Sequence, residues 1–415
     1  MSEDSIKEFQ LENGLKVILY RNTNIPMVCI NTVFHVGAKN DAKGKKGMAH
    51  LFEHLMFEGS KNVPHGMFDE ILSKNGGESN AYTSWDVTSY YIVLPSSGLE
   101  LGLWIESDRM NGFIISDNEL EIQKEVIEEE KMTIFDNTPY GSLEEESSKK
   151  LFENSGYGDT IIGNMDHLRS ITLEEINAHF KKYYSPSNAV LSVGGDIEFA
   201  QAENLVRKYY SDINISGKVD EYKYKENELK FYEGTIKDNI QLPGRFIFYR
   251  TPKMGVKDYY SLKILSALLT DGESSILYKK LVLDNELVNE IDSYVHGMEN
   301  AGIFSINAIM LLESDEEKAK ILIDESIEDI KNGKISEKDI EKINNKIETQ
   351  AEIRKNNLIS YTDRLAYFKT IYGSIEKVYT EAEEFKKITI NDLTEAAKTY
   401  LKKDQRVILN YVSKN

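Results

Sequence analysis

The amino-acid sequence predicts an α+β fold of the α/β-roll type, built as two homologous lobes that each carry an antiparallel-rich sheet covered by helices. Two observations support this fold class. Apolar residues recur with the period of strands and then of helices along all 415 residues. In addition, residues 171–191 (ITLEEINAHFKKYYSPSNAVL) resemble residues 388–408 (ITINDLTEAAKTYLKKDQRVI). Both segments begin with Ile-Thr, a helix-capping signal, and continue through an amphipathic helix into a strand.

The elements of the first half follow from local patterns. The Asn13-Gly14 turn precedes an apolar strand at 16–21, and the next strand is expected at 28–35 (VCINTVFH). A mostly apolar helix then follows near 47–58. After it we expect a helix, two strands and another helix, at 68–75, within 81–94 and at 98–111.

The second half repeats this order. A strand at 245–250 (RFIFYR) and a helix at 257–270 precede a helix, two strands and a helix, at 275–285, within 290–311 and at 314–331. The stretch around 213–232 is poor in apolar residues and rich in Lys, Glu and Tyr, which is typical of a linker. We therefore expect a first lobe over 1–215, a linker over 216–232 and a second lobe over 233–415.

Composition excludes several classes of function. The net charge of −19 at pH 7 argues against a nucleic-acid partner, which requires clustered cations. The single cysteine, Cys29, excludes an intramolecular disulfide and an all-cysteine metal site. No stretch approaches the roughly 18 apolar residues of a membrane span, and no secretion leader is visible. We therefore expect a cytoplasmic protein as written, or a periplasmic one if a leader was removed.

The histidines point to chemistry in the first half. Six of the seven lie there, and two of them occur in the segment 47–59 (GMAHLFEHLMFEG). At about 100° per residue, His50, Glu53 and His54 share one face of a helix whose other face is apolar. Imidazoles at i and i+4 can bind one tetrahedral zinc ion, and a carboxylate beside the metal can take a proton from water. Two structural histidines beside a solvated Glu are the alternative interpretation.

A catalytic zinc requires a third protein ligand. The best candidate is Glu130 in the segment 119–135, because its spacing from Val126, Ile127 and Ile134 places it on the expected inward stripe. From the residues alone, the run 128–130 is more typical of a charged helix surface.

The motif resembles that of the pitrilysin/insulinase metallopeptidases, or inverzincins, a group that includes mitochondrial processing peptidase. The resemblance includes His-x-x-Glu-His at 50–54, a Glu in a Val-containing helix 76 residues after His54, and the segments 76–83 (GGESNAYT) and 157–163 (YGDTIIG). It implies a zinc-bearing catalytic first lobe and a homologous second lobe without metal. One zinc ion per chain would be held by His50, His54 and Glu130, with Glu53 as general base. The resemblance further implies that Asn80, Ala81, Tyr82 and Thr83 form an edge strand that binds an extended peptide.

Two departures from the family pattern affect the expected function. Gln123 stands where many members carry a Glu that contacts the ligands as a second-shell partner. Val282 and Asn289 stand where members that complete their active site with their own second lobe carry an Arg and a Tyr. We therefore expect the zinc-bearing chain of a two-chain endopeptidase for short or unfolded peptides, paired with a zinc-less homologous subunit. A homodimer, and a non-catalytic assembly or peptide-binding subunit, are the alternatives.

Overall fold

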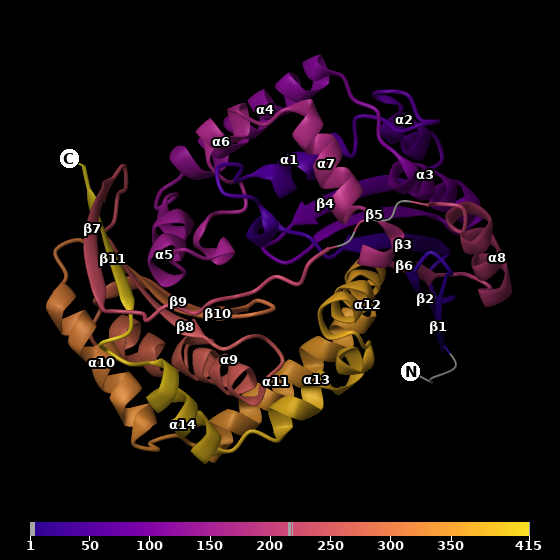
Figure 1. Ribbon diagram of the computed structural model, residues 1–415. Coiled ribbons are helices and arrows are strands. Elements are labelled where there is room, and N and C mark those ends of the chain that lie inside the picture. The colour runs from indigo at the N-terminus through magenta and orange to yellow at the C-terminus, as the bar shows by residue number, and fades with distance from the viewer. Residues whose placement is uncertain (1–4, 215–216, 218, 415) are drawn as a thin grey trace. The chain divides into compact units, whose positions relative to one another are not determined.

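The structure is a computed structural model that describes residues 5–214, 217 and 219–414 (Figure 1). Contacts between residues divide the chain into two compact units, which are described separately. The first unit comprises Met1–Lys131, Asp159–Lys223 and Glu352–Tyr379, and the second comprises Met132–Gly158, Tyr224–Ala351 and Thr380–Asn415.

The first unit contains a six-stranded mixed sheet. Its spatial order is β1 (Ile6–Gln10), β2 (Lys16–Arg21), β6 (Ala189–Gly195), β3 (Met27–Phe34), β5 (Thr88–Pro95) and β4 (Glu78–Thr83). Only β2 and β6 pair in parallel, and the other neighbours are antiparallel. In the described sheet β4 is therefore an edge strand that pairs with β5 alone.

Helices cover both faces of this sheet. They are α1 (Met48–Leu55), α2 (Met67–Lys74), α3 (Leu99–Asn111), α4 (Asp117–Lys131), α6 (Met165–Arg169), α7 (Leu173–Tyr183), α8 (Phe199–Tyr210) and α12 (Leu358–Tyr372). Thr83 hydrogen-bonds Glu53 of α1, whereas the neighbouring Tyr82 hydrogen-bonds Asp363 of α12. Because consecutive residues of a strand point to opposite faces, α1 and α12 lie on opposite faces of the sheet.

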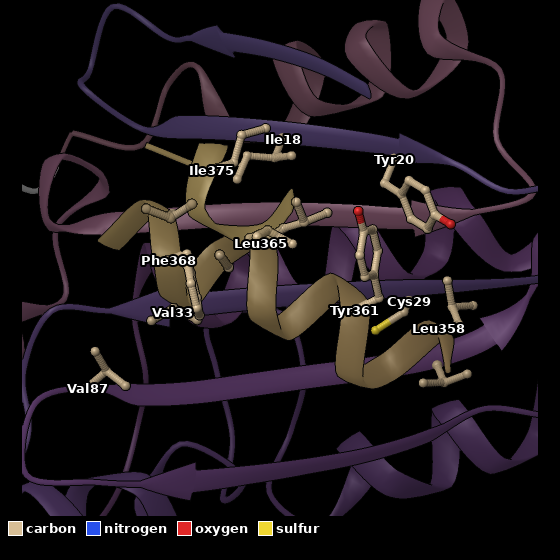
Figure 2. Close-up of a cluster of buried hydrophobic side chains, with 14 residues drawn as sticks. Ile18, Tyr20, Cys29, Val33, Val87, Leu358, Tyr361, Leu365, Phe368 and Ile375 are labelled. Carbon is tan, nitrogen blue, oxygen red and sulfur yellow. The ribbon is translucent and has the colours of Figure 1, made fainter. Parts of the chain in front are cut away.

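Helix α12 covers its face of the sheet with an apolar stripe. Figure 2 shows Leu358, Tyr361, Leu365 and Phe368 packed over the strands, with Cys29 beneath them. The spacing of these four residues is that of one helix face. Cys29 is fully buried, as expected for a small core residue.

The second unit contains a five-stranded mixed sheet. Its order is β7 (Tyr232–Asp238), β11 (Val407–Ser413), β8 (Gly244–Thr251), β10 (Gly302–Met310) and β9 (Val288–Gly297), with β7 and β11 parallel and the rest antiparallel. Its helices are α5 (Leu143–Leu151), α9 (Lys257–Thr270), α10 (Glu316–Lys331) and α14 (Ile390–Tyr400). Two further helices, α11 (Glu337–Lys355) and α13 (Glu376–Lys386), each contain a boundary between the units.

The predicted α+β fold with two homologous lobes is confirmed. The order β2-β6-β3-β5-β4 in the first sheet has the same pairing directions as β7-β11-β8-β10-β9 in the second. The repeated segments also form equivalent elements, α7 with β6 and α14 with β11. Thr172 and Thr389 each cap the following helix, and Glu175 and Asp392 complete the two capping boxes.

The predicted linker forms neither helix nor strand from Val219 to Phe231, while residues 215, 216 and 218 lie outside the described part of the chain. The boundaries 1–215, 216–232 and 233–415 stay a prediction. One finding that the sequence patterns did not indicate is that 352–379 packs with the first unit. In the described residues, no helix combines the length and the apolar character that a membrane crossing requires.

Candidate metal centre

Helix α1 presents the predicted metal-binding face because its other face is buried in the core and its N-terminus is held by hydrogen bonds. Leu51, Phe52 and Leu55 are fully buried. The helix begins after Gly47, which has a positive φ of 97° and no capping side chain. The carboxylate of Asp41 takes the place of that cap and accepts hydrogen bonds from the backbone N–H groups of Gly47 (2.8 Å) and Ala49 (3.0 Å). The sequence analysis missed Asp41, because six residues separate it from the helix that it caps.

His50, His54 and Glu130 come together in the first unit. One ligand atom of each lies within 4.8 Å of the other two. Oε2 of Glu130 is 3.8 Å from Nε2 of His50 and 3.5 Å from Nε2 of His54. Ligand atoms about 2.1 Å from a tetrahedral zinc ion are roughly 3.4 Å apart, so this spacing suits such an ion. Two imidazoles and a carboxylate are also a donor set that zinc accepts. Their role as metal ligands stays a prediction.

The electrostatics of His50 and Glu130 favours the forms that bind a metal. Burial, together with the neighbouring His54, lowers the pKa of His50 to about 4, so the His50 imidazole is neutral at pH 7. The hydrogen bond from His54 holds the pKa of Glu130 below its usual range, so this carboxylate is ionised. Burial lowers the pKa of His54, but the interactions with Glu130 and Glu53 outweigh burial and leave the pKa raised.

Glu53 lies on the same face of α1, and its carboxylate is oriented by the edge strand. Oγ1 of Thr83 donates a hydrogen bond to Oε2 of Glu53 at 2.5 Å. Burial raises the pKa of Glu53, and this hydrogen bond offsets only part of the rise. Thr83 was predicted to bind substrate through the strand, which stays a prediction, and its side chain contacts the predicted general base. The sequence analysis missed this contact.

The other predicted residues of the edge strand have different surroundings. Asn80 and Ala81 lie in β4, and Oδ1 of Asn80 accepts a hydrogen bond from the backbone N–H of Ala81 at 2.8 Å. Tyr82 donates its hydroxyl to the half-buried carboxylate of Asp363 at 3.0 Å. The predicted binding of a peptide by these residues therefore depends on the backbone at the free edge of β4.

Helix α4 supplies Glu130, but the apolar stripe that predicted its position is partly wrong. Ile127 is fully buried, whereas Val126 is 42% and Ile134 is 52% exposed. The inward face contains Leu120, Ile127 and, three residues further on, Glu130. Ile134 does not continue this face, because α4 ends at Lys131 and a π-helix follows over Met132–Asp136.

Gln123 lies two turns before Glu130 on α4, and its amide nitrogen donates to Oε1 of Glu58 at 2.5 Å. Its predicted role as a partner of the metal ligands stays a prediction. The residues at the positions of the missing Arg and Tyr lie in the second unit. Val282 is half-buried in the π-helix Tyr278–Leu283, and Asn289 is exposed on β9.

Comparisons with protein-family models cover most of the chain. A model described as "Insulinase (Peptidase family M16)" matches residues 16–164, and one described as "Peptidase M16 inactive domain" matches residues 170–347. The zinc protease PqqE of Helicobacter pylori is 29% identical over 404 residues, which is 95% of this chain and 90% of that protein. The uncharacterized zinc protease YmxG of Bacillus subtilis is 24% identical over 301 residues, 72% of this chain and 73% of that protein. A probable mitochondrial-processing peptidase subunit beta of Arabidopsis thaliana is 21% identical over 312 residues, 72% of this chain and 58% of that protein.

Solved structures share the fold. The structure of a protease from Helicobacter pylori superposes with a TM-score of 0.91 at 26% identity. The superposition covers 98% of this chain and 99% of that protease. The first half of the periplasmic protease PqqL from Escherichia coli gives a TM-score of 0.81 at 20% identity, over 99% of this chain and 92% of that one. At that identity the second comparison shows a common fold alone.

Proposed function

The chain belongs to peptidase family M16, and we propose that it is a zinc-dependent endopeptidase that hydrolyses short or unfolded peptides. One observation carries this proposal. His50, His54 and Glu130 converge with a spacing that suits zinc, and Glu53 lies beside them on the same helix face. The names of the curated relatives, which describe zinc proteases, agree with it.

The chain's own residues account for binding and proton transfer. His50, His54 and Glu130 hold one zinc ion, which when bound polarises a peptide carbonyl and makes a water molecule more acidic. Glu53 accepts the proton of the attacking water at its carboxylate and later delivers it to the leaving amine nitrogen. The edge strand β4 binds the peptide as an additional strand through backbone hydrogen bonds, with little dependence on its sequence.

Zinc content and three variants test this assignment. We expect about one zinc ion per purified chain. Glu53→Gln keeps zinc and peptide binding but loses hydrolysis, because the amide cannot accept the proton of water. Glu130→Gln loses zinc, whereas Glu129→Gln, at an exposed position on the same helix, retains zinc and activity. Unchanged peptide cleavage by Glu53→Gln, or a Glu129→Gln variant that loses zinc as Glu130→Gln does, contradicts the assigned roles.

We further propose that this chain is the zinc-bearing subunit of a two-chain enzyme with a zinc-less homologue. Val282 and Asn289 supply neither the guanidinium nor the phenol that the family pattern places at these positions. One curated relative is named as a subunit of a processing peptidase. We expect weak peptide turnover by the purified chain and strong turnover after the partner is added. Full activity of the chain alone, as a monomer or a homodimer, refutes the two-chain proposal and leaves the zinc site unaffected.

The measurements of zinc content and peptide turnover also distinguish the proposed peptidase from the alternative, a non-catalytic subunit. An assembly or peptide-binding subunit binds peptide without cleaving it, with or without the partner. The compartment stays a prediction, cytoplasmic or periplasmic, and the structural relative PqqL is described as a periplasmic protease.

A further inference from the structure

A second group of potential metal ligands comes together in the first unit, outside the candidate metal centre. Glu58 lies in the turn after α1, His65 in the turn before α2, and Glu119 in the first turn of α4. Nδ1 of His65 is 2.7 Å from Oε2 of Glu58 and 3.2 Å from Oε1 of Glu119. One ligand atom of each residue lies within 4.8 Å of the other two. Three segments that are distant in sequence therefore direct a nitrogen and two oxygens to one point.

Neighbouring groups orient both carboxylates of this cluster. The side-chain amide of Gln123 donates to Oε1 of Glu58 at 2.5 Å. The backbone N–H of Ser116 donates to Oε2 of Glu119 at 2.5 Å, and this hydrogen bond holds the pKa of Glu119 below its usual range. In each carboxylate the other oxygen is the one that faces Nδ1 of His65. The two oxygens are thus held in place by groups that do not belong to the cluster.

The loop that carries His65 is also fixed. The buried carboxylate of Asp108 on α3 accepts hydrogen bonds from Oγ of Ser60 at 2.6 Å and from the backbone N–H of Asn62 at 2.8 Å. The side-chain amide of Asn62 donates to the same carboxylate. These bonds hold the backbone of the loop before His65, whereas the His65 side chain is 59% exposed and can adjust its position.

The charges of the cluster favour a divalent cation. Two carboxylates face one ring nitrogen, so a single positive charge on that ring leaves a negative charge uncompensated. A divalent ion in the same position compensates both carboxylates, and an imidazole nitrogen with carboxylate oxygens is a donor set that zinc accepts. We propose that Glu58, His65 and Glu119 form a second zinc site, which joins the loop 59–66 to α4. This site does not depend on the proposed catalytic role of the first centre.

The distances fit a zinc ion after a small movement of one exposed side chain. Two ligand atoms of a tetrahedral zinc ion are roughly 3.4 Å apart, close to the 3.2 Å between His65 and Glu119. The 2.7 Å contact with Glu58 is a hydrogen-bond distance, and a bound ion replaces the proton there and widens the contact by about 0.7 Å. Because one ligand is exposed, we expect weaker binding than at the first centre. The purified chain therefore retains one ion, and the second site fills when zinc is added.

Titration of the metal-free full chain with Zn²⁺, in competition with a chromophoric chelator, tests the second site. We expect a tight and a weaker class of binding, with about two ions per chain at saturation. His65→Ala and Glu119→Gln each lose the weaker class, whereas Glu130→Gln loses the tight class and keeps the weaker one. The matched control is Glu125→Gln, which removes one charge from an exposed position on the same helix as Glu119 and keeps both classes.

Thermal unfolding shows whether each metal-free variant is folded and provides a second readout. We expect excess zinc to raise the thermal midpoint of Glu130→Gln but not that of the double variant Glu130→Gln/His65→Ala. A wild-type chain that binds a single ion in excess zinc, or His65→Ala and Glu119→Gln variants that still bind two, overturns the second site and leaves the first centre standing. A single ion that is lost in His65→Ala and kept in Glu130→Gln supports the second site and overturns the proposed catalytic centre instead.

Discussion

The hydrogen bond between Thr83 and Glu53 provides the sharpest test of how the proposed base is oriented. The change Thr83→Val removes one hydroxyl and keeps a β-branched side chain of the same shape, which suits the strand. What is lost is the donor that lies 2.5 Å from Oε2 of Glu53. The backbone of β4 and the groups that converge on the metal position are unchanged by the substitution.

The expected fall in kcat of Thr83→Val follows from the charge of the Glu53 carboxylate, which accepts the lost hydrogen bond. A hydrogen bond to a charged group contributes about 1.5–3 kcal/mol. Every 1.36 kcal/mol changes a rate by a factor of ten, so we expect kcat of Thr83→Val to fall by about 10- to 100-fold. KM and zinc content stay near the wild-type values, because Thr83 contacts neither the predicted ligands nor, through its side chain, the peptide.

The assay is steady-state hydrolysis of an unstructured peptide by the active assembly, with zinc quantified for each variant. Thr83→Ser is the control, because it keeps the hydroxyl and loses only a methyl group, and its kcat is expected to stay within about threefold of the wild type. A Thr83→Val enzyme with wild-type kcat refutes the orienting role of this hydrogen bond. A rise in KM alone indicates that the side chain binds substrate.

Two further predictions concern stability. Burial and the nearby positive Lys182 lower the pKa of His179 to about 3, so between pH 6.5 and pH 3 the unfolded chain binds a proton that the folded chain does not. We therefore expect the unfolding free energy of the metal-free wild type to fall by about 3 kcal/mol more than that of His179→Phe between pH 7.5 and pH 4.5. Urea denaturation at the two pH values measures this difference. Equal losses in the two proteins contradict a buried neutral His179. Tyr82 donates its hydroxyl to the half-buried Asp363, so Tyr82→Phe should lower the unfolding free energy by about 1.5–3 kcal/mol without changing KM. A raised KM at unchanged stability would assign Tyr82 to the substrate instead.

Much of the fold could be predicted because its signals are local. The repeated helix and strand at 171–191 and 388–408 form the same elements with the same capping boxes. His50, Glu53 and His54 share a face because four residues span about one turn of an α-helix. These predictions needed only the periodicity of the chain and the chemistry of a few side chains.

The rest depends on contacts between segments that are distant in sequence. Helix α12 lies more than 260 residues beyond most strands of the sheet that it covers, and no local pattern indicates which sheet that is. The stripe failed at Ile134 because α4 changes to a π-helix at Met132, and it failed at Val126 because this residue lies on an exposed side of α4. The contact between Gln123 and Glu58 joins α4 to the turn after α1, 65 residues apart, and the residue types alone do not pair them.

The position of the edge strand couples substrate binding to proton transfer. Tyr82 and Thr83 are adjacent, so their side chains point to opposite faces of the sheet, one to Asp363 and the other to Glu53. A shift of β4 by one residue would exchange these faces and remove both hydrogen bonds at once. The pairing of Tyr82 with Ser89 and of Thr83 with Thr88 fixes the register, and Ser89 also donates to Asp363 at 2.8 Å. The backbone of β4, which binds the peptide in our proposal, is therefore held at one position relative to the base.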